Sequence, residues 1–75
     1  MTKTEIIREV IAKELCVNER EVEPQASLVS LGASSLDIAA LAIELEDALG
    51  IDIFDKDMKE LVTVQDIFDY AEAKA

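Results

Sequence analysis

The chain has 75 residues, 51% of them hydrophobic and 32% charged, and 17 acidic residues against seven basic ones give a formal net charge of −10 at pH 7. This length excludes two domains, and the composition is too apolar for a disordered segment, so we expect one small domain over residues 1–75. A chain this short has few atoms with which to enclose a deep active site, so its length argues against an enzyme.

Acidic residues dominate the middle of the chain. Between Arg20 and Lys56 the sequence contains no lysine or arginine but several aspartates and glutamates. The resulting negative potential favours basic partners and repels nucleic acids and anionic lipid surfaces, which are polyanions. No apolar run approaches the length of a membrane span. We therefore expect neither nucleic acid nor a membrane as a partner.

Histidine is absent, which removes the commonest general base, the usual catalytic triads and most zinc sites. The acidic run that starts at Asp55 lacks the glycine of a calcium-binding loop, so no metal site is expected. Cys16 is the only cysteine and no secretory signal is apparent, which indicates a reducing, cytoplasmic setting. We expect Cys16 to be a small core or boundary residue rather than a reactive thiol.

The first predicted element is an amphipathic helix over about residues 4–16. Thr2, with Glu5 three residues later, matches a capping box at its start, and Asn18 is expected to end it. Its apolar residues recur at helical spacing and are Ile6, Ile7, Val10, Ile11 and Leu15.

Residues 17–34 are predicted to form a long, ordered loop. No periodic pattern persists there, and Pro24 interrupts the segment. Loops of this length in compact domains are uncommon, and scattered apolar residues indicate that this one packs down over the helices. These residues are Val22, Leu28, Val29 and Leu31. Gly32 then supplies a flexible turn before the next helix.

The second predicted helix covers about residues 35–50 and has apolar residues on two sides. The broad stripe, expected to face the core, consists of Ile38, Leu41, Ala42, Leu45, Ala48 and Leu49. On the opposite side, an apolar strip lies among acidic residues that include Glu46. We call this side the acidic face, which consists of Leu36, Asp37, Ala40, Ile43, Glu44 and Asp47. It is typical of a docking surface for a partner with an apolar pocket ringed by lysine and arginine, although scattered exposed apolar residues are also normal.

The remainder of the chain predicts two more helices. Asp55 can cap a short helix that runs through Met58 to Leu61. The brief alternation of apolar Ile51 and Ile53 before it does not predict a sheet. A capping-box pattern from Thr63 to Asp66 opens the last helix. Its core face consists of Val64, Ile67, Phe68 and Ala71. The predicted fold is an all-α four-helix bundle with a short third helix and a long first loop.

The start of the second helix has two adjacent serines. If Ser34 is the N-cap, its hydroxyl accepts the amide of Asp37, and the carboxylate of Asp37 reaches back to the amide of Ser34. Ser35 then has an uncommitted hydroxyl in the first helical turn, where the helix dipole would stabilise a phosphate ester by about 0.3 to 1 kcal/mol. Two serines that share ordinary capping are the alternative.

The segment Leu31–Asp37, LGASSLD, resembles the LGADSLD segment of acyl carrier proteins, in which the serine before leucine carries 4′-phosphopantetheine. The resemblance extends over nearly the whole chain. Further similar segments are Ala26-Ser27-Leu28, Leu45-Glu46 followed by Ile51-Asp52-Ile53, and Thr63-Val64-Gln65-Asp66. It implies the same four-helix fold with a short third helix and a long first loop.

The resemblance implies that Ser35 becomes a phosphodiester with 4′-phosphopantetheine, whose terminal thiol holds an acyl group as a thioester. The protein would then be a monomeric carrier for fatty acid, polyketide or related biosynthesis that catalyses nothing itself. Its partners would be a phosphopantetheinyl transferase, together with acyl-loading and synthase enzymes whose basic patches dock on the acidic face. The acyl chain is expected to lie between the helices against Ile53, Leu61 or Ile67.

Two positions depart from the family pattern. Ser34 stands where the family usually has an aspartate that helps to engage the transferase, and Ala40 stands where it often has a glutamate. The change at Ser34 is expected to alter recognition by the transferase, and the change at Ala40 favours a dedicated partner over the general fatty acid machinery. Two other functions stay open: an aminoacyl, peptidyl or aryl carrier of a nonribosomal pathway, and an unmodified acidic helical module that binds a basic protein.

Overall fold

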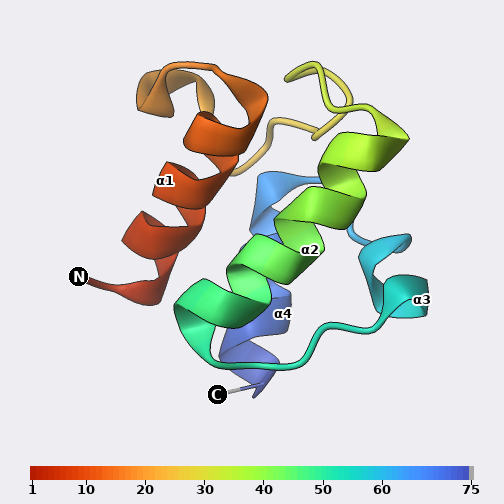
Figure 1. Ribbon diagram of the computed structural model, residues 1–75. Coiled ribbons are helices and arrows are strands. Elements are labelled where there is room, and N and C mark those ends of the chain that lie inside the picture. The colour runs from red at the N-terminus through yellow and green to blue at the C-terminus, as the bar shows by residue number, and fades with distance from the viewer. Residues whose placement is uncertain (75) are drawn as a thin grey trace.

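The computed structural model describes residues 1–74 and is all-helical (Figure 1). Its elements are α1 (Lys3–Leu15), the 3₁₀ turn η1 (Glu19–Glu21), α2 (Ser35–Leu49), α3 (Asp55–Met58) and α4 (Val64–Lys74). The only extended pairing in this part of the chain is an isolated bridge between Ser27 and Thr63. The predicted four helices, short third helix and long first loop are confirmed.

The helices pack around one core (Figure 1). α1 packs against α2 and α4, and α2 also packs against the short α3. The fully buried side chains come from α1, α2, α4 and the long loop, and they are Ile7, Ile11, Val22, Leu28, Leu41, Leu45 and Val64. Burial of this apolar surface is the main force that holds such a small domain together.

The long loop is ordered because it contributes to the core and is hydrogen-bonded to the start of α4. Val22 and Leu28 are fully buried. The amide of Leu28 donates to the carbonyl of Val62 at 3.0 Å, and the amide of Gln65 donates to the carbonyl of Pro24 at 2.8 Å. The predicted packing of this loop over the helices is therefore confirmed.

Two of the predicted helix starts are made by capping boxes. Thr2 Oγ1 accepts the amide of Glu5 at 3.2 Å, and Glu5 Oε1 accepts the amide of Thr2 at 3.2 Å. At α4, Thr63 Oγ1 accepts the amide of Asp66 at 3.1 Å, and Asp66 Oδ2 accepts the amide of Thr63 at 3.0 Å. Both predictions are confirmed, because these bonds depend only on residues three positions apart.

The predicted end of the first helix was partly wrong. α1 ends at Leu15, and Cys16 adopts a left-handed conformation with φ 56°. Asn18 begins the next turn instead, because its Oδ1 accepts the amide of Arg20 at 3.3 Å. Cys16 is exposed and is not a core residue. Its left-handed backbone turns the chain away from the helix, so its side chain leaves the buried stripe of α1.

Two further predictions need correction. Ala48 is exposed, although the helical period places it on the same stripe as the buried Leu41. The period gives the direction of a side chain around the axis, but it does not reveal whether a neighbour covers the last turn. Asp55 is the first residue of α3 rather than its cap; Phe54 occupies the N-cap position and makes no side-chain cap bond. α3 ends at Met58, before the predicted Leu61.

Candidate functional site at the start of α2

Ser34 and Asp37 fix the start of α2. The amide of Ser34 donates to Asp37 Oδ2 at 2.9 Å, and the amide of Asp37 donates to Ser34 Oγ at 3.2 Å. The hydrogen bond from the Ser34 amide is the main cause that lowers the pKa of Asp37, and the Ser34 hydroxyl lowers it further. Gly32, with φ 94°, makes the turn that leads into this cap. The predicted capping box is confirmed, so the hydroxyl of Ser34 is used in the N-terminal cap of α2.

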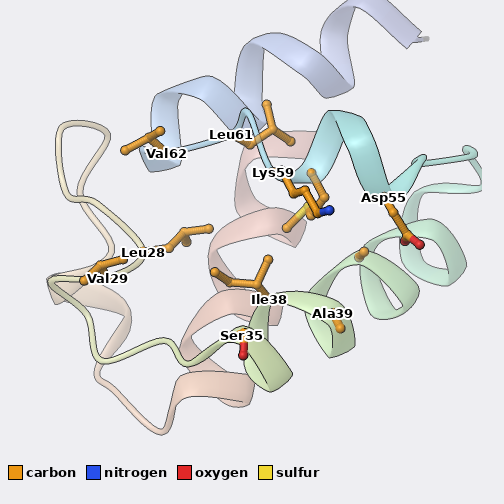
Figure 2. A pocket seen from close by; sticks show the side chains of 11 residues that line it. Leu28, Val29, Ser35, Ile38, Ala39, Asp55, Lys59, Leu61 and Val62 are labelled. Carbon is orange, nitrogen blue, oxygen red and sulfur yellow. The ribbon is translucent and has the colours of Figure 1, made fainter.

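Ser35 is the first residue of α2 and is exposed. The three hydrogen bonds of the cap join Ser34 to Asp37 and leave the Ser35 hydroxyl out. The first amides of a helix have no intrahelical partner and carry the positive end of its dipole. Figure 2 shows Ser35 at the edge of a cavity, with its oxygen directed away from Ile38. A phosphate group bound to this oxygen would therefore lie in solvent at a favourable helix end.

The two large apolar side chains of the acidic face are strongly exposed. Leu36 is 82% exposed and Ile43 is 60% exposed, so neither contributes to the core. Asp47 is exposed, while Asp37, Ala40 and Glu44 are half-buried. The prediction that α2 presents a second, outward apolar strip is confirmed for Leu36 and Ile43. A surface of this kind can bind a partner that has both an apolar pocket and basic residues.

Glu46, which was grouped near this strip from the sequence, has a different role. Its Oε2 accepts the amide of Ile53 at 2.7 Å, and this bond ties the segment after α2 back to the helix. Glu46 is half-buried. Its carboxylate is therefore used within the fold.

Glu14 is a carboxyl group next to this face that the sequence analysis missed. It lies on α1 and meets Glu44 and Asp37 of α2. The shared hydrogen bond with Glu44 is the largest cause that raises the pKa of Glu14 to about 6, and burial raises it as well. The sequence signal was weak: Glu14 follows the buried Ile11 by three residues, a spacing that places it beside the packed stripe of α1.

This contact makes the stability of the fold depend on pH. The pKa of Glu14 rises from 4.5 to about 6 on folding, so the folded chain binds more protons within that window and loses stability as the pH rises through it. We expect the Glu14→Gln variant to gain stability relative to wild type as the pH rises from 4.5 to about 6, and to keep the gain above it. Urea unfolding at a series of pH values measures this difference.

Glu9→Gln is the matched control, because Glu9 lies on the exposed side of the same helix. A stability difference between Glu14→Gln and wild type that stays constant over the whole window would contradict the raised pKa of Glu14.

A cavity of about 470 Å³ opens beside Ser35 (Figure 2). Apolar side chains from the long loop, α2, α3 and the segment before α4 line most of it, and they include Leu28, Ile38, Ala42, Met58, Leu61 and Val62. Leu61, one of the three side chains expected to lie against an acyl chain, lines this cavity. The other two, Ile53 and Ile67, are buried in the core and do not line it.

Two further searches cover the part of the chain that the structure describes. Over residues 1–74, no helix combines the length and apolarity needed to cross a bilayer. Within the same residues, no group of three histidine, cysteine, aspartate or glutamate side chains is placed to hold a metal ion.

Comparison with known proteins agrees with this site. A family model described as a phosphopantetheine attachment site matches residues 5–71. An acyl carrier protein of Syntrophus aciditrophicus (strain SB) is 40% identical, over 99% of this chain and 94% of that protein. A free-standing peptidyl carrier protein from an uncharacterized secondary metabolic pathway of Acinetobacter baumannii has the same fold: its crystal structure gives a TM-score of 0.79 at 23% identity, covering 93% of this chain and 88% of that one. The chain therefore belongs to the acyl carrier protein family and has its phosphopantetheine attachment site.

Proposed function

We propose that the chain is a single carrier domain over residues 1–75 and that Ser35 carries 4′-phosphopantetheine on its hydroxyl. The observation that supports this assignment most strongly is that two adjacent serines differ in their hydrogen bonds. Ser34 is bound within the cap, whereas Ser35 is exposed and uncommitted at the first position of α2. A phosphodiester at Ser35 would leave the cap intact. One at Ser34 would remove the hydroxyl donor and crowd the amide of Asp37.

The arm supplies a terminal thiol that holds an acyl group as a thioester. The chain itself then needs no catalytic side chain, and the exposed Cys16 has no part in loading. Its contribution is to present Ser35 and to shelter the cargo in the apolar cavity beside it. We assign the protein to fatty acid, polyketide or related biosynthesis in the cytoplasm, with an acyl group as its cargo.

Carrier proteins of this family work with a phosphopantetheinyl transferase and with synthases. We propose that these enzymes bind this chain, as a monomer, through basic patches that meet the acidic face. Leu36 and Ile43 supply exposed apolar anchors, and Asp37, Glu44 and Asp47 supply charge. Attraction of this kind weakens as salt increases. Neither nucleic acid nor a membrane enters this function.

The serine at position 34, where the family usually has an aspartate, supports a partner enzyme adapted to this chain. Ser34 reproduces the cap geometry through its hydroxyl, so the helix start is kept while a negative charge next to Ser35 is missing. Ala40 likewise lowers the charge of the acidic face. A transferase or synthase adapted to this chain would therefore have fewer basic residues opposite positions 34 and 40.

Incubation with coenzyme A and a broad-specificity transferase, followed by intact mass measurement, tests the proposal. Gain of one arm supports the carrier function. If neither the wild-type chain treated in this way nor the protein from its native cell carries the arm, the carrier function is wrong. The alternative function, an unmodified helical module that binds a basic protein, then takes its place.

Substitutions on the acidic face are expected to slow loading without unfolding the bundle. Ile43→Lys replaces an exposed apolar anchor by a charge, and Asp47→Lys reverses a charge toward a basic partner. We expect each change to lower the rate of arm transfer by roughly tenfold at low salt. Time-resolved intact mass measures the rate, and circular dichroism checks the fold.

Glu72→Lys is the control for Asp47→Lys, because it makes the same charge reversal at an exposed position on α4. The docking proposal predicts a much smaller effect at this position. Equal slowing by both reversals would show that net charge, rather than the acidic face, governs the encounter.

A further inference from the structure

The two arginines of the chain, Arg8 and Arg20, line one pocket. It has a volume of about 480 Å³ and lies between α1, η1 and α4. Among residues 1–74, it shares no lining residue with the cavity beside Ser35. In a chain with a net charge of −10, two guanidinium groups at one pocket make a local positive site on a negative molecule. We call this space the arginine pocket.

The guanidinium of Arg8 is held by a neutral group. Its Nη2 donates to the carbonyl of Glu19 at 2.9 Å, which fixes the position of the charge. Its Nε is buried and has no hydrogen-bond partner among the described residues. Arginine has five N–H donors in a planar fork that matches a carboxylate or phosphate, so Arg8 keeps donors for a ligand. A half-buried cation of this kind gains from an added anion, because attraction between charges is stronger where water is partly excluded.

Arg20 supplies a second, exposed charge. The backbone of η1 is fixed by its capping box, in which Asn18 Oδ1 accepts the amide of Arg20 at 3.3 Å and Glu21 Oε2 accepts the amide of Asn18 at 2.9 Å. Two like charges that line one pocket repel each other, and a bound anion would offset this repulsion.

The floor of the arginine pocket is apolar and preformed. Val22 is fully buried and Phe68 is 8% exposed, and both line the pocket. Pro24 also lines it, and its carbonyl accepts the amide of Gln65 at the start of α4 at 2.8 Å. These contacts lie within the chain itself, so the pocket needs no ligand to form. An apolar floor with a few charged groups, in a pocket of this volume, is typical of a small-molecule site.

One carboxylate opposes the two arginines. Glu23 is exposed and lines the same pocket. Its charge repels an anionic ligand, so it lowers the affinity of the pocket, although the two guanidinium groups still outnumber it. Removal of this carboxylate therefore has the opposite expected effect to removal of an arginine.

We propose that the arginine pocket binds a small organic anion, in which a carboxylate or phosphate is attached to an apolar group. The anion would accept hydrogen bonds from Arg8 and Arg20, and the apolar group would cover Val22 and Phe68. The net charge of the chain repels anions at long range, but salt at about 0.15 M screens exposed charges that are more than about 8 Å apart. The guanidinium groups in the pocket therefore decide the binding. This inference uses neither Ser35 nor the arm.

Chemical-shift titration of the unmodified chain with benzoate, at constant ionic strength, tests the site. Benzoate is expected to shift the backbone amides of Val22 and Phe68 in a saturable way. Benzyl alcohol has the ring without the charge and is expected to bind about tenfold more weakly. Phenyl phosphate replaces the carboxylate by a phosphate, and the tighter of the two acids identifies the preferred anion. Absence of saturable shifts with both acids, or equal binding of benzyl alcohol, would overturn the proposal.

Two substitutions at exposed positions of the pocket are expected to have opposite effects on benzoate binding. Arg20→Gln is expected to weaken it about tenfold, because one charged group of donors is lost. Glu23→Gln is expected to strengthen it several-fold, because the opposing carboxylate becomes neutral. Circular dichroism checks that both variants keep the fold.

Lys56→Gln and Glu60→Gln are the matched controls. They make the same changes in net charge at exposed positions on α3 and just after it, a segment that contributes no residue to the arginine pocket. The proposal expects both controls to bind benzoate within about twofold of wild type. Equal weakening by Arg20→Gln and Lys56→Gln, or equal strengthening by the two glutamate substitutions, would overturn it, because net charge would then govern binding. Loading of the arm is a separate measurement, so failure of this site and failure of the proposed function are distinguishable.

Discussion

The Ser35→Ala chain is expected to gain no phosphopantetheine from coenzyme A and a broad-specificity transferase, whereas the wild-type chain gains one arm. Ser35 is the exposed serine at the first position of α2, and alanine has no oxygen with which to form the phosphodiester. The substitution removes no hydrogen bond of the cap, which joins Ser34 to Asp37. Intact mass measurement separates the two outcomes, and an unchanged circular dichroism spectrum shows that the helix start persists.

Ser34→Ala is the control for this result. It removes the hydroxyl that accepts the amide of Asp37, so the free energy of unfolding is expected to fall by about 1 kcal/mol. The oxygen of Ser35 is untouched, and the variant is expected to gain the arm at a reduced rate. An arm on the Ser35→Ala chain together with none on the Ser34→Ala chain would reverse the assignment.

Leu41→Ala is expected to have the largest effect on stability. Leu41 is fully buried in α2 among side chains of the other elements. Truncation loses its burial and leaves a cavity, which together cost about 3 kcal/mol or more. A domain of this size has roughly 5 to 10 kcal/mol in total, so the variant keeps only a part of its stability. Urea unfolding followed by circular dichroism measures the loss.

Leu36→Ala is a matched comparison, because it makes the same change on the same helix at a side chain that is 82% exposed. We expect its free energy of unfolding to change by less than about 0.5 kcal/mol. Its rate of arm transfer is expected to fall, since we propose Leu36 as an anchor of the acidic face. Comparable destabilisation by both substitutions would show that the two sides of α2 have been misassigned.

Local sequence signals predicted most of the fold. The capping pairs Ser34–Asp37 and Thr63–Asp66 were visible in the sequence because each pair is three residues apart and forms the same bonds wherever a helix begins. The apolar periods predicted the core side of α2 at Leu41 and Leu45.

Features that depend on a neighbouring element were not predictable in this way. The raised pKa of Glu14 depends on its position next to Glu44, which needs two helices at a particular separation and rotation. The bond from Tyr70 to Asp57 joins residues 13 positions apart, and no periodic pattern reports it. The exposure of Cys16 followed from one left-handed residue at the end of α1, which composition does not indicate.

The candidate site likewise has features that the sequence predicted and features that it did not. The spare hydroxyl of Ser35 followed from the capping pattern, and the outward position of Leu36 and Ile43 followed from the helical period. The cavity beside them could not be predicted, because its lining comes from the long loop, α2, α3 and the segment before α4 together. Of the three side chains that the resemblance named for the acyl chain, Leu61 lines this cavity, whereas Ile53 and Ile67 belong to the buried core.

The most direct test of the central claim is fragmentation mass spectrometry of the protein purified from its native cell. The expected result is one phosphopantetheine arm on the fragment ions that contain Ser35, with unmodified mass on those that end at Ser34. An arm on Ser34, on any other residue, or on none, would contradict the assignment.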